Sequence, residues 1–70
     1  MRKNNDWNRV TYVEYGDEKC MTNPKKDYTL LHNAKVKQYC VAWDYNKENN
    51  TWSQGHYFET FDEAVVFMFS

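Results

Sequence analysis

The segment VKQYCVAWDY, residues 36–45, constrains the fold most strongly because large and small side chains alternate along it. Its bulky residues fall on one side of an extended chain: Tyr39, Val41, Trp43 and Tyr45. The turn-forming segment NKENN and a second aromatic segment, TWSQGHYFE, follow at hairpin distance. We predict a hairpin that places Trp43 opposite Gln54 and Val41 opposite His56, with its large rings on one surface.

A helix is predicted at the C-terminal end, in the segment ETFDEAVVFMFS. Thr60 and Glu63 have the spacing of a capping box, and acidic residues suit the positive end of the helix dipole. A core-facing stripe follows with helical spacing, formed by Phe61, Ala64, Val65 and Met68. Apolar residues also occupy the other side of this helix: Val66, Phe67 and Phe69. We expect these three either to pack under the lysine-rich connection or to meet another chain.

The N-terminal half is expected to supply one more strand and a helical turn. Residues 7–15, WNRVTYVEY, are rich in β-branched and aromatic residues and end at Gly16. In the segment TNPKKDYTLLHN, Asn23 is a candidate N-cap and Pro24 suits the first helical position. The predicted fold class is therefore α+β, a single domain over residues 1–70. It comprises a small three-stranded antiparallel sheet, a C-terminal helix on one face, and a short helix between strands one and two.

Charge is unevenly distributed along a chain whose formal net charge is only -1. Residues 19–37 contain five lysines and one acidic residue, and candidate phosphate contacts among them are Lys25, Lys26, Lys35 and Lys37. From residue 48 onward there are four acidic residues and no lysine or arginine, giving a candidate acidic face of Glu48, Glu59, Asp62 and Glu63. The first ten residues lack an apolar run, and no segment approaches the roughly 20 apolar residues that span a bilayer. We therefore expect a cytoplasmic protein with no membrane partner.

Catalytic and metal chemistry have little support in the sequence. The soft ligands Cys20, His32, Cys40 and His56 lack the close spacing of small zinc sites, so no metal and no cofactor are predicted. In the predicted register Cys40 points away from His56, which disfavours a thiol–imidazole pair. We expect free thiols, although a disulfide stays open as an alternative. The chain is predicted not to be an enzyme.

Two resemblances bear on function. Three strands leading through GHYFETFDEA into a helix resemble the DNA-binding domains of the AP2 and integrase N-terminal type, with Gly55, Phe58, Thr60, Glu63 and Ala64 fitting the pattern. That resemblance implies a sheet that reads DNA. As a short, aromatic-rich, charge-polarised chain without catalytic residues, the sequence also resembles accessory proteins of phages and mobile elements, including anti-CRISPR proteins. This second resemblance implies a protein that occupies a surface on a nuclease, in the host cytoplasm if it is phage-encoded.

The expected function is a non-enzymatic protein-binding module, an inhibitor or adaptor of a host nucleic-acid-handling protein of anti-CRISPR type. Candidate contact residues are the acidic face and the rings of the aromatic hairpin, Trp43, Tyr45 and Trp52. Those rings suit a stacking platform for single strands or an ordinary core. A homodimer through the C-terminal helix is a further expectation, because exposed apolar helix residues are typical of interfaces. The alternative function is a DNA-binding module of three strands and a helix.

Overall fold

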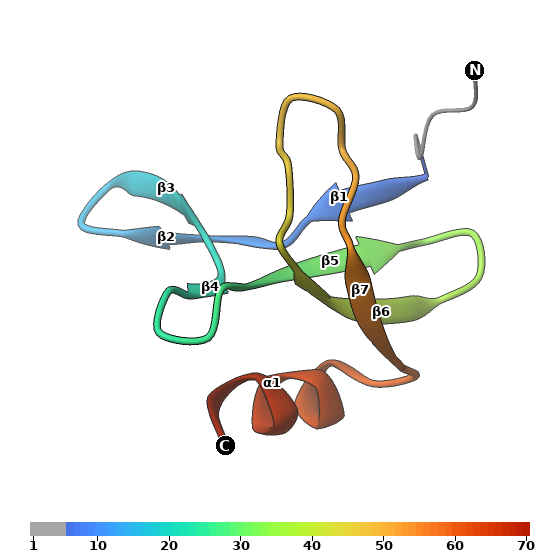
Figure 1. Cartoon of the computed structure of the whole chain (residues 1–70). Helices are drawn as coiled ribbons and strands as arrows, with labels where there is room; N and C mark the ends of the chain where they lie inside the picture. Colours follow the sequence, from blue (N-terminus) through green and yellow to red (C-terminus); the bar gives the residue numbers. More distant parts are fainter. Residues whose placement is uncertain (1–5) are drawn as a thin grey trace.

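The computed structural model describes residues 6–70 and contains eight elements, a set of antiparallel strands followed by one helix (Figure 1). The strands are β1 (Trp7–Arg9), β2 (Thr11–Glu14), β3 (Asp17–Cys20), β4 (Thr22–Asn23), β5 (Tyr28–Asn33), β6 (Gln38–Trp43) and β7 (Gln54–Phe58), and the helix is α1 (Phe61–Phe69). The predicted α+β class with a C-terminal helix is confirmed. The predicted three-stranded sheet is wrong, because the structure has a five-stranded sheet and a separate two-stranded sheet.

The main sheet is ordered β1-β5-β6-β7, and β4 pairs with β5 alongside β1. Strand β5 is therefore central, with β6 on one side and two short strands sharing the other. The predicted register of the β6–β7 hairpin is confirmed: Tyr39 lies opposite Phe58, Val41 opposite His56, and Trp43 opposite Gln54. Alternation along both strands specified this pairing, because a slip of one residue would exchange the two faces.

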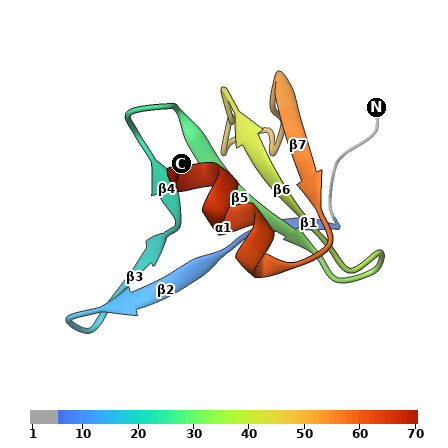
Figure 2. The same ribbon diagram turned by 90° about the horizontal axis from the view of Figure 1, so that it is seen from below.

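The predicted first strand is divided at Val10, where the sheet forks. Val10 N–H donates to Leu30 O at 2.9 Å, and Met21 N–H donates to Val10 O at 2.9 Å. Beyond this point β2 and β3 leave the main sheet as a two-stranded arm (Figures 1 and 2). The arm turns at Tyr15 and Gly16, which both have positive φ, as the mirror-image turns of tight hairpins require. Tyr15 at the tip is 98% exposed.

The predicted helix around Pro24 is wrong, because this segment is the end of β4, a four-residue turn and the central strand β5. The cap does form locally: Asn23 Oδ1 accepts the N–H of Lys25 at 3.3 Å. The chain then leaves the helical path at Asp27, where φ is 59°. Leu30 and Leu31 are both fully buried, so β5 is covered on both faces. A strand buried on both faces shows no alternation, which made it look like helix in the sequence.

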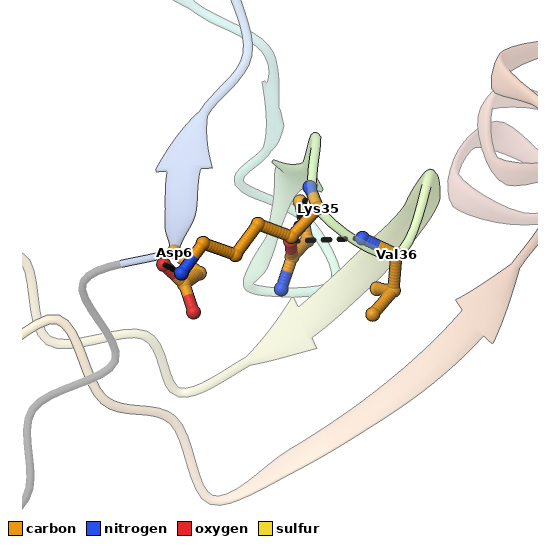
Figure 3. A network of polar contacts seen from close by, with 4 residues as sticks. Asp6, Lys35 and Val36 are labelled. Atoms are coloured by element: carbon orange, nitrogen blue, oxygen red, sulfur yellow. Dashed lines mark hydrogen bonds and ion pairs between the residues drawn. The ribbon is translucent and has the colours of Figure 1, made fainter.

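The same turn design closes three hairpins. In each, an asparagine side chain accepts the N–H of the residue two positions later, and the residue four positions later has positive φ. The asparagines are Asn23, Asn33 and Asn46, and the residues with positive φ are Asp27, Lys37 and Asn50. Figure 3 shows the second turn, where Asn33 Oδ1 accepts from the N–H groups of Lys35 and Val36. An ion pair of 3.3 Å between Lys35 and Asp6 ties this turn to the residue before β1.

Helix α1 covers one face of the main sheet. Its N-terminal cap forms as predicted, with Thr60 Oγ1 accepting the N–H of Glu63 at 3.2 Å. Ala64 and Met68 are fully buried against Leu30 and Val41 of the sheet. At the other end, Asn23 Nδ2 donates to Met68 O at 2.8 Å and Lys26 Nζ donates to Ser70 O. The β4–β5 turn therefore supplies partners for carbonyls that a helix C-terminus leaves unpaired.

The opposite face of the sheet has its own smaller core, formed by Leu31, Cys40 and Ala42. Rings from β1 and from residues 44–53 pack over it: Trp7, Tyr45 and Trp52. The loop of residues 44–53 is fastened there, since Tyr45 donates to Asn50 Oδ1 at 2.7 Å and Asn50 Nδ2 donates to Trp7 O at 3.0 Å. Gly55 makes the close packing possible, because a Cβ at this position would lie 2.6 Å from Cys40 Sγ. The sheet is thus covered on one face by α1 and on the other by this loop.

Candidate functional site

A groove of about 520 Å³ lies between α1 and the end of β7. Its lining consists of three apolar residues, two carboxylates and the last residue of the chain: Phe58, Val66, Phe67, Asp62, Glu63 and Ser70. We call this set the α1–β7 groove. Val66 is 69% exposed within it, while Asp62 and Glu63 are exposed side chains at its margin. The site is an apolar surface edged by negative charge.

The walls of the groove are held by packing beneath them. Phe67 is partly buried, and its ring lies 5.4 Å from that of Phe58 and 4.5 Å from that of His56. It also lies 5.6 Å from the Tyr28 ring, which follows the lysine-rich turn. Phe67 therefore belongs largely to the protein's own core. Of the two expectations for the C-terminal apolar residues, packing within the chain describes Phe67 better than contact with another chain. Val66 and Phe69, 69% and 54% exposed, are left at the surface.

Strand β7, beside the groove, is an edge of the main sheet, and among residues 6–70 no further strand pairs with its outer side. An edge strand presents unpaired backbone N–H and C=O groups to an approaching chain. Natural edges are commonly protected by charge or proline, yet QGHYF, residues 54–58, contains no lysine, arginine, aspartate, glutamate or proline. Sequence reasoning identified this strand but not its position at the edge. The absence of charge was the available signal.

The predicted acidic face is brought together only in part. Glu59, Asp62 and Glu63 follow one another from the end of β7 into the first turn of α1. Glu48 lies in the 44–53 loop, whose tip is far from α1 in Figure 1. Its backbone N–H bonds to Asn46 Oδ1 at 2.9 Å as part of a hairpin turn. Glu48 therefore shares no surface with the other three carboxylates.

The expectation that the hairpin rings share one surface is also wrong. Trp43 alternates with Val41 along β6 and so lies on the α1 side of the sheet, where it is 43% exposed, whereas Tyr45 and Trp52 pack on the opposite face. Asp44, between Trp43 and Tyr45, has a φ of 60° and its carboxylate accepts a hydrogen bond from Ser53 at 2.8 Å. This left-handed residue interrupts the alternation of the strand. No common stacking platform of the three rings results.

The four candidate phosphate-contacting lysines lie in two turns at opposite ends of β5. Lys25 and Lys26 precede β5, and Lys35 and Lys37 follow it, so about 20 Å of strand separates the pairs. Lys26 donates to Ser70 O, and Lys35 is paired with Asp6. Two of the four cations thus have contacts within the protein. The arrangement does not give one continuous basic track for a nucleic-acid backbone.

The described residues do not bring Cys40 and His56 together and form no cluster of metal ligands. Both cysteines are free, and Cys40 is fully buried. Burial raises the pKa of the Cys40 thiol to about 11, and a hydrogen bond with Tyr57 offsets this only in part. Cys40 lies opposite Tyr57 in the sheet, while His56 faces Val41, so the two side chains point to different faces. Within residues 6–70 no group of three or more histidine, cysteine or acidic side chains is placed to hold a metal.

The helix α1 has nine residues, and no helix in the described part of the chain is long and apolar enough to cross a membrane.

No protein-family model, curated protein or solved structure matches the chain.

Proposed function

We propose that this chain is a non-enzymatic protein-binding module that takes a basic, apolar segment of another protein into the α1–β7 groove. The observation that carries the proposal is the combination of an apolar floor with carboxylates as the only charged side chains in the groove lining. Apolar contact would supply affinity, and the carboxylates would select a segment with lysine or arginine beside its apolar residues.

The edge of β7 supports a specific mode of binding. An extended partner segment can pair with β7, and its alternate side chains then fall on the α1 side of the sheet. Phe58 lies at the end of β7 and also lines the groove, so the edge and the groove are continuous. We therefore propose that the partner segment adds a strand to β7 and places apolar side chains beside Val66 and Phe67.

A foreign partner fits this surface better than a second copy of the chain. An isologous dimer would place the same patch on both sides of the interface, which doubles the buried carboxylates without adding a cation from the patch. Burying unpaired charges at an interface is costly. Proteins that handle nucleic acids expose basic surfaces, so an inhibitor or adaptor of such a protein, acting in the cytoplasm, suits the proposal. The DNA-binding alternative has weaker support, because the lysines are divided between two turns.

Binding of a defined peptide tests this function. The probe is a fluorescent heptapeptide that alternates lysine with valine or phenylalanine, and the matched peptide carries glutamate in place of lysine. We expect the lysine peptide to bind and to weaken as salt rises, since exposed charges are screened. Each exposed pair contributes about 0.2–1 kcal/mol, so Asp62→Asn with Glu63→Gln should weaken binding about tenfold.

Glu48→Gln is the control, because it removes an equal exposed charge far from the groove. Glutamine at position 63 suits a capping box as glutamate does, so the double variant should keep its helix, which circular dichroism will verify. The proposed function would be contradicted if the two peptides bound equally well. It would also be contradicted if the double variant and Glu48→Gln changed the affinity for the lysine peptide by the same factor.

A further inference from the structure

A second pocket, of about 330 Å³, lies on the face of the sheet opposite α1, at the fork between the main sheet and the arm. Its lining comes from four strands, β1, β3, β4 and β5, and from the 44–53 loop. The lining residues are Arg9, Cys20, Thr22, Thr29, Tyr45 and Lys47. We call this set the fork pocket. None of its residues belongs to the α1–β7 groove, so the two surfaces can be tested separately.

The fork itself creates the pocket. Val10, Met21 and Leu30 meet at the branch point and direct their side chains into the core beneath α1. Because successive side chains of a strand alternate between faces, the neighbours of these residues are directed to the opposite face. The neighbours are Arg9, Cys20, Thr22 and Thr29. Since the β2–β3 arm leaves the sheet at this point, the space above them is open.

The far wall of the pocket is held in place by the chain of hydrogen bonds that fastens the 44–53 loop. Tyr45 donates to Asn50 Oδ1 at 2.7 Å, and Asn50 Nδ2 donates to Trp7 O at 3.0 Å. These contacts position Tyr45, a residue of the pocket wall, with Lys47 two residues further along the loop. The pocket is therefore assembled by tertiary contacts between segments distant in sequence.

The lining carries two cations and no carboxylate. Arg9 donates from Nη1 to Cys20 Sγ at 3.5 Å, and neither Arg9 nor Lys47 forms an ion pair within residues 6–70. Burial raises the pKa of the Tyr45 phenol, with the nearby charge of Arg9 acting in the opposite direction, so the phenol adds no negative charge at neutral pH. The nearest acidic residue along the arm on this face, Glu18, accepts a hydrogen bond from Thr11 at 3.1 Å.

Two hydroxyls complete the donor set. Thr22 and Thr29 are direct partners across β4 and β5, which places their side chains next to each other on this face. A guanidinium, an ammonium and paired hydroxyls are the donors that bind phosphate oxygens in proteins. We propose that the fork pocket binds a small phosphorylated molecule, with Arg9 and Lys47 neutralising the phosphate and Thr22 and Thr29 donating hydrogen bonds to its oxygens.

Titration of the ¹⁵N-labelled protein with pyrophosphate, AMP and adenosine tests this proposal. We expect saturable shifts at the amides of β1, β4 and the 44–53 loop with pyrophosphate or AMP, and none with adenosine. Arg9→Gln and Lys47→Gln should each raise the dissociation constant about tenfold. Lys37→Gln removes another exposed cation, at the far end of β5, and should leave the constant unchanged.

The same titration shows whether the pocket recognises a phosphate group alone or a nucleotide. Equal affinities for pyrophosphate and AMP would assign recognition to the phosphate group alone, whereas at least tenfold tighter binding of AMP would assign it to a nucleotide. Both results support the site. Absence of saturable binding by either compound would overturn the proposal, as would an effect of Lys37→Gln equal to that of Arg9→Gln.

Cys20 supplies an independent readout, since it lines the pocket and the other thiol, Cys40, is fully buried. Alkylation of the native protein with iodoacetamide should modify Cys20 first. Bound pyrophosphate or AMP should slow this reaction in proportion to the occupancy found by titration, and the Arg9→Gln variant should need about tenfold more ligand for the same protection. An alkylation rate that saturating ligand does not change would place the binding elsewhere and overturn the assignment.

Discussion

Replacement of Gly55 by alanine should destabilise the protein through the loop-covered face of the sheet. An added Cβ would lie 2.6 Å from Cys40 Sγ and 2.9 Å from Trp52 Nε1, both closer than such atoms normally approach. Cys40 is fully buried in the sheet and has little room to move. Relief must therefore come from displacing Trp52, whose ring also lies 5.9 Å from Trp7 in an edge-to-face contact.

The loss of unfolding free energy follows from the added methyl group and from the displacement of Trp52. Forcing an extra methyl group into a packed core costs about 1–3 kcal/mol. Displacing Trp52 would also expose part of Leu31, Cys40 and Ala42, so we expect the upper part of this range. For a chain of this size, 1 kcal/mol corresponds to about 4–8 °C in the melting temperature. The melting temperature of Gly55→Ala should accordingly fall by about 10–20 °C.

Urea unfolding followed by tryptophan fluorescence measures this effect. Gly16→Ala is a useful comparison, because a Cβ there meets nothing within 4 Å and the cost arises only from its φ of 85°. The double variant Gly55→Ala with Cys40→Ala removes the sulfur of the closest contact, and the two changes should couple by about 1 kcal/mol. If Gly55→Ala unfolds within about 0.5 kcal/mol of the parent protein, the packing of Trp52 over Gly55 is refuted.

Three further predictions concern single residues. Asn33→Ala removes the buried side-chain oxygen that accepts the N–H groups of Lys35 and Val36, and it should cost about 1–3 kcal/mol in urea unfolding, more than Asn46→Ala at an exposed turn. Thr60→Ala removes the cap of α1 and should cost about 1 kcal/mol, with partial loss of helical dichroism at 222 nm. Because burial raises the Cys40 pKa from 9.0 to about 11, the folded state holds its proton longer than the unfolded state, so stability should fall between those pH values. The urea midpoint of the parent protein should therefore fall as pH rises from 9 to 11, and the midpoint of Cys40→Ala should fall less over the same pH range.

The elements that sequence reasoning predicted correctly are those specified by local patterns. The β6–β7 register follows from bulky residues at every second position, and the start of α1 follows from a threonine and a glutamate three residues apart. Each of these patterns depends on neighbouring residues or on a hairpin partner close in sequence. The apolar part of the candidate site, at Val66 and Phe67, could therefore be anticipated from the excess of apolar residues around the predicted helix.

The remaining elements depend on contacts distant in sequence. Strand β5 could not be recognised by alternation, because Leu30 and Leu31 are buried on opposite faces by different parts of the chain. Asn23 and Pro24 are suited equally to a helix start and to a turn, and the choice is made by pairing of β5 with β6. The fork at Val10 requires three strands to meet, which no local pattern encodes.

The site was incompletely predicted for the same reason. Glu48 is acidic like Glu59 and Asp62, but it lies on a different surface, because the 44–53 loop folds toward the opposite face of the sheet. The left-handed residue Asp44 separates Trp43 from the other rings of the hairpin. Arg9, which lines the fork pocket, stands 20 residues from Thr29, and only tertiary structure brings the two together.

Addition of a partner segment to β7 beside the α1–β7 groove can be measured by amide hydrogen exchange with and without the lysine-bearing heptapeptide. We expect slower exchange at β7 amides that face away from β6, together with smaller protection around Val66 and Phe67, and no change in the β2–β3 arm. Peptide binding with unchanged exchange in β7, or with protection confined to the arm or the lysine-rich turns, would show that the segment does not add to β7.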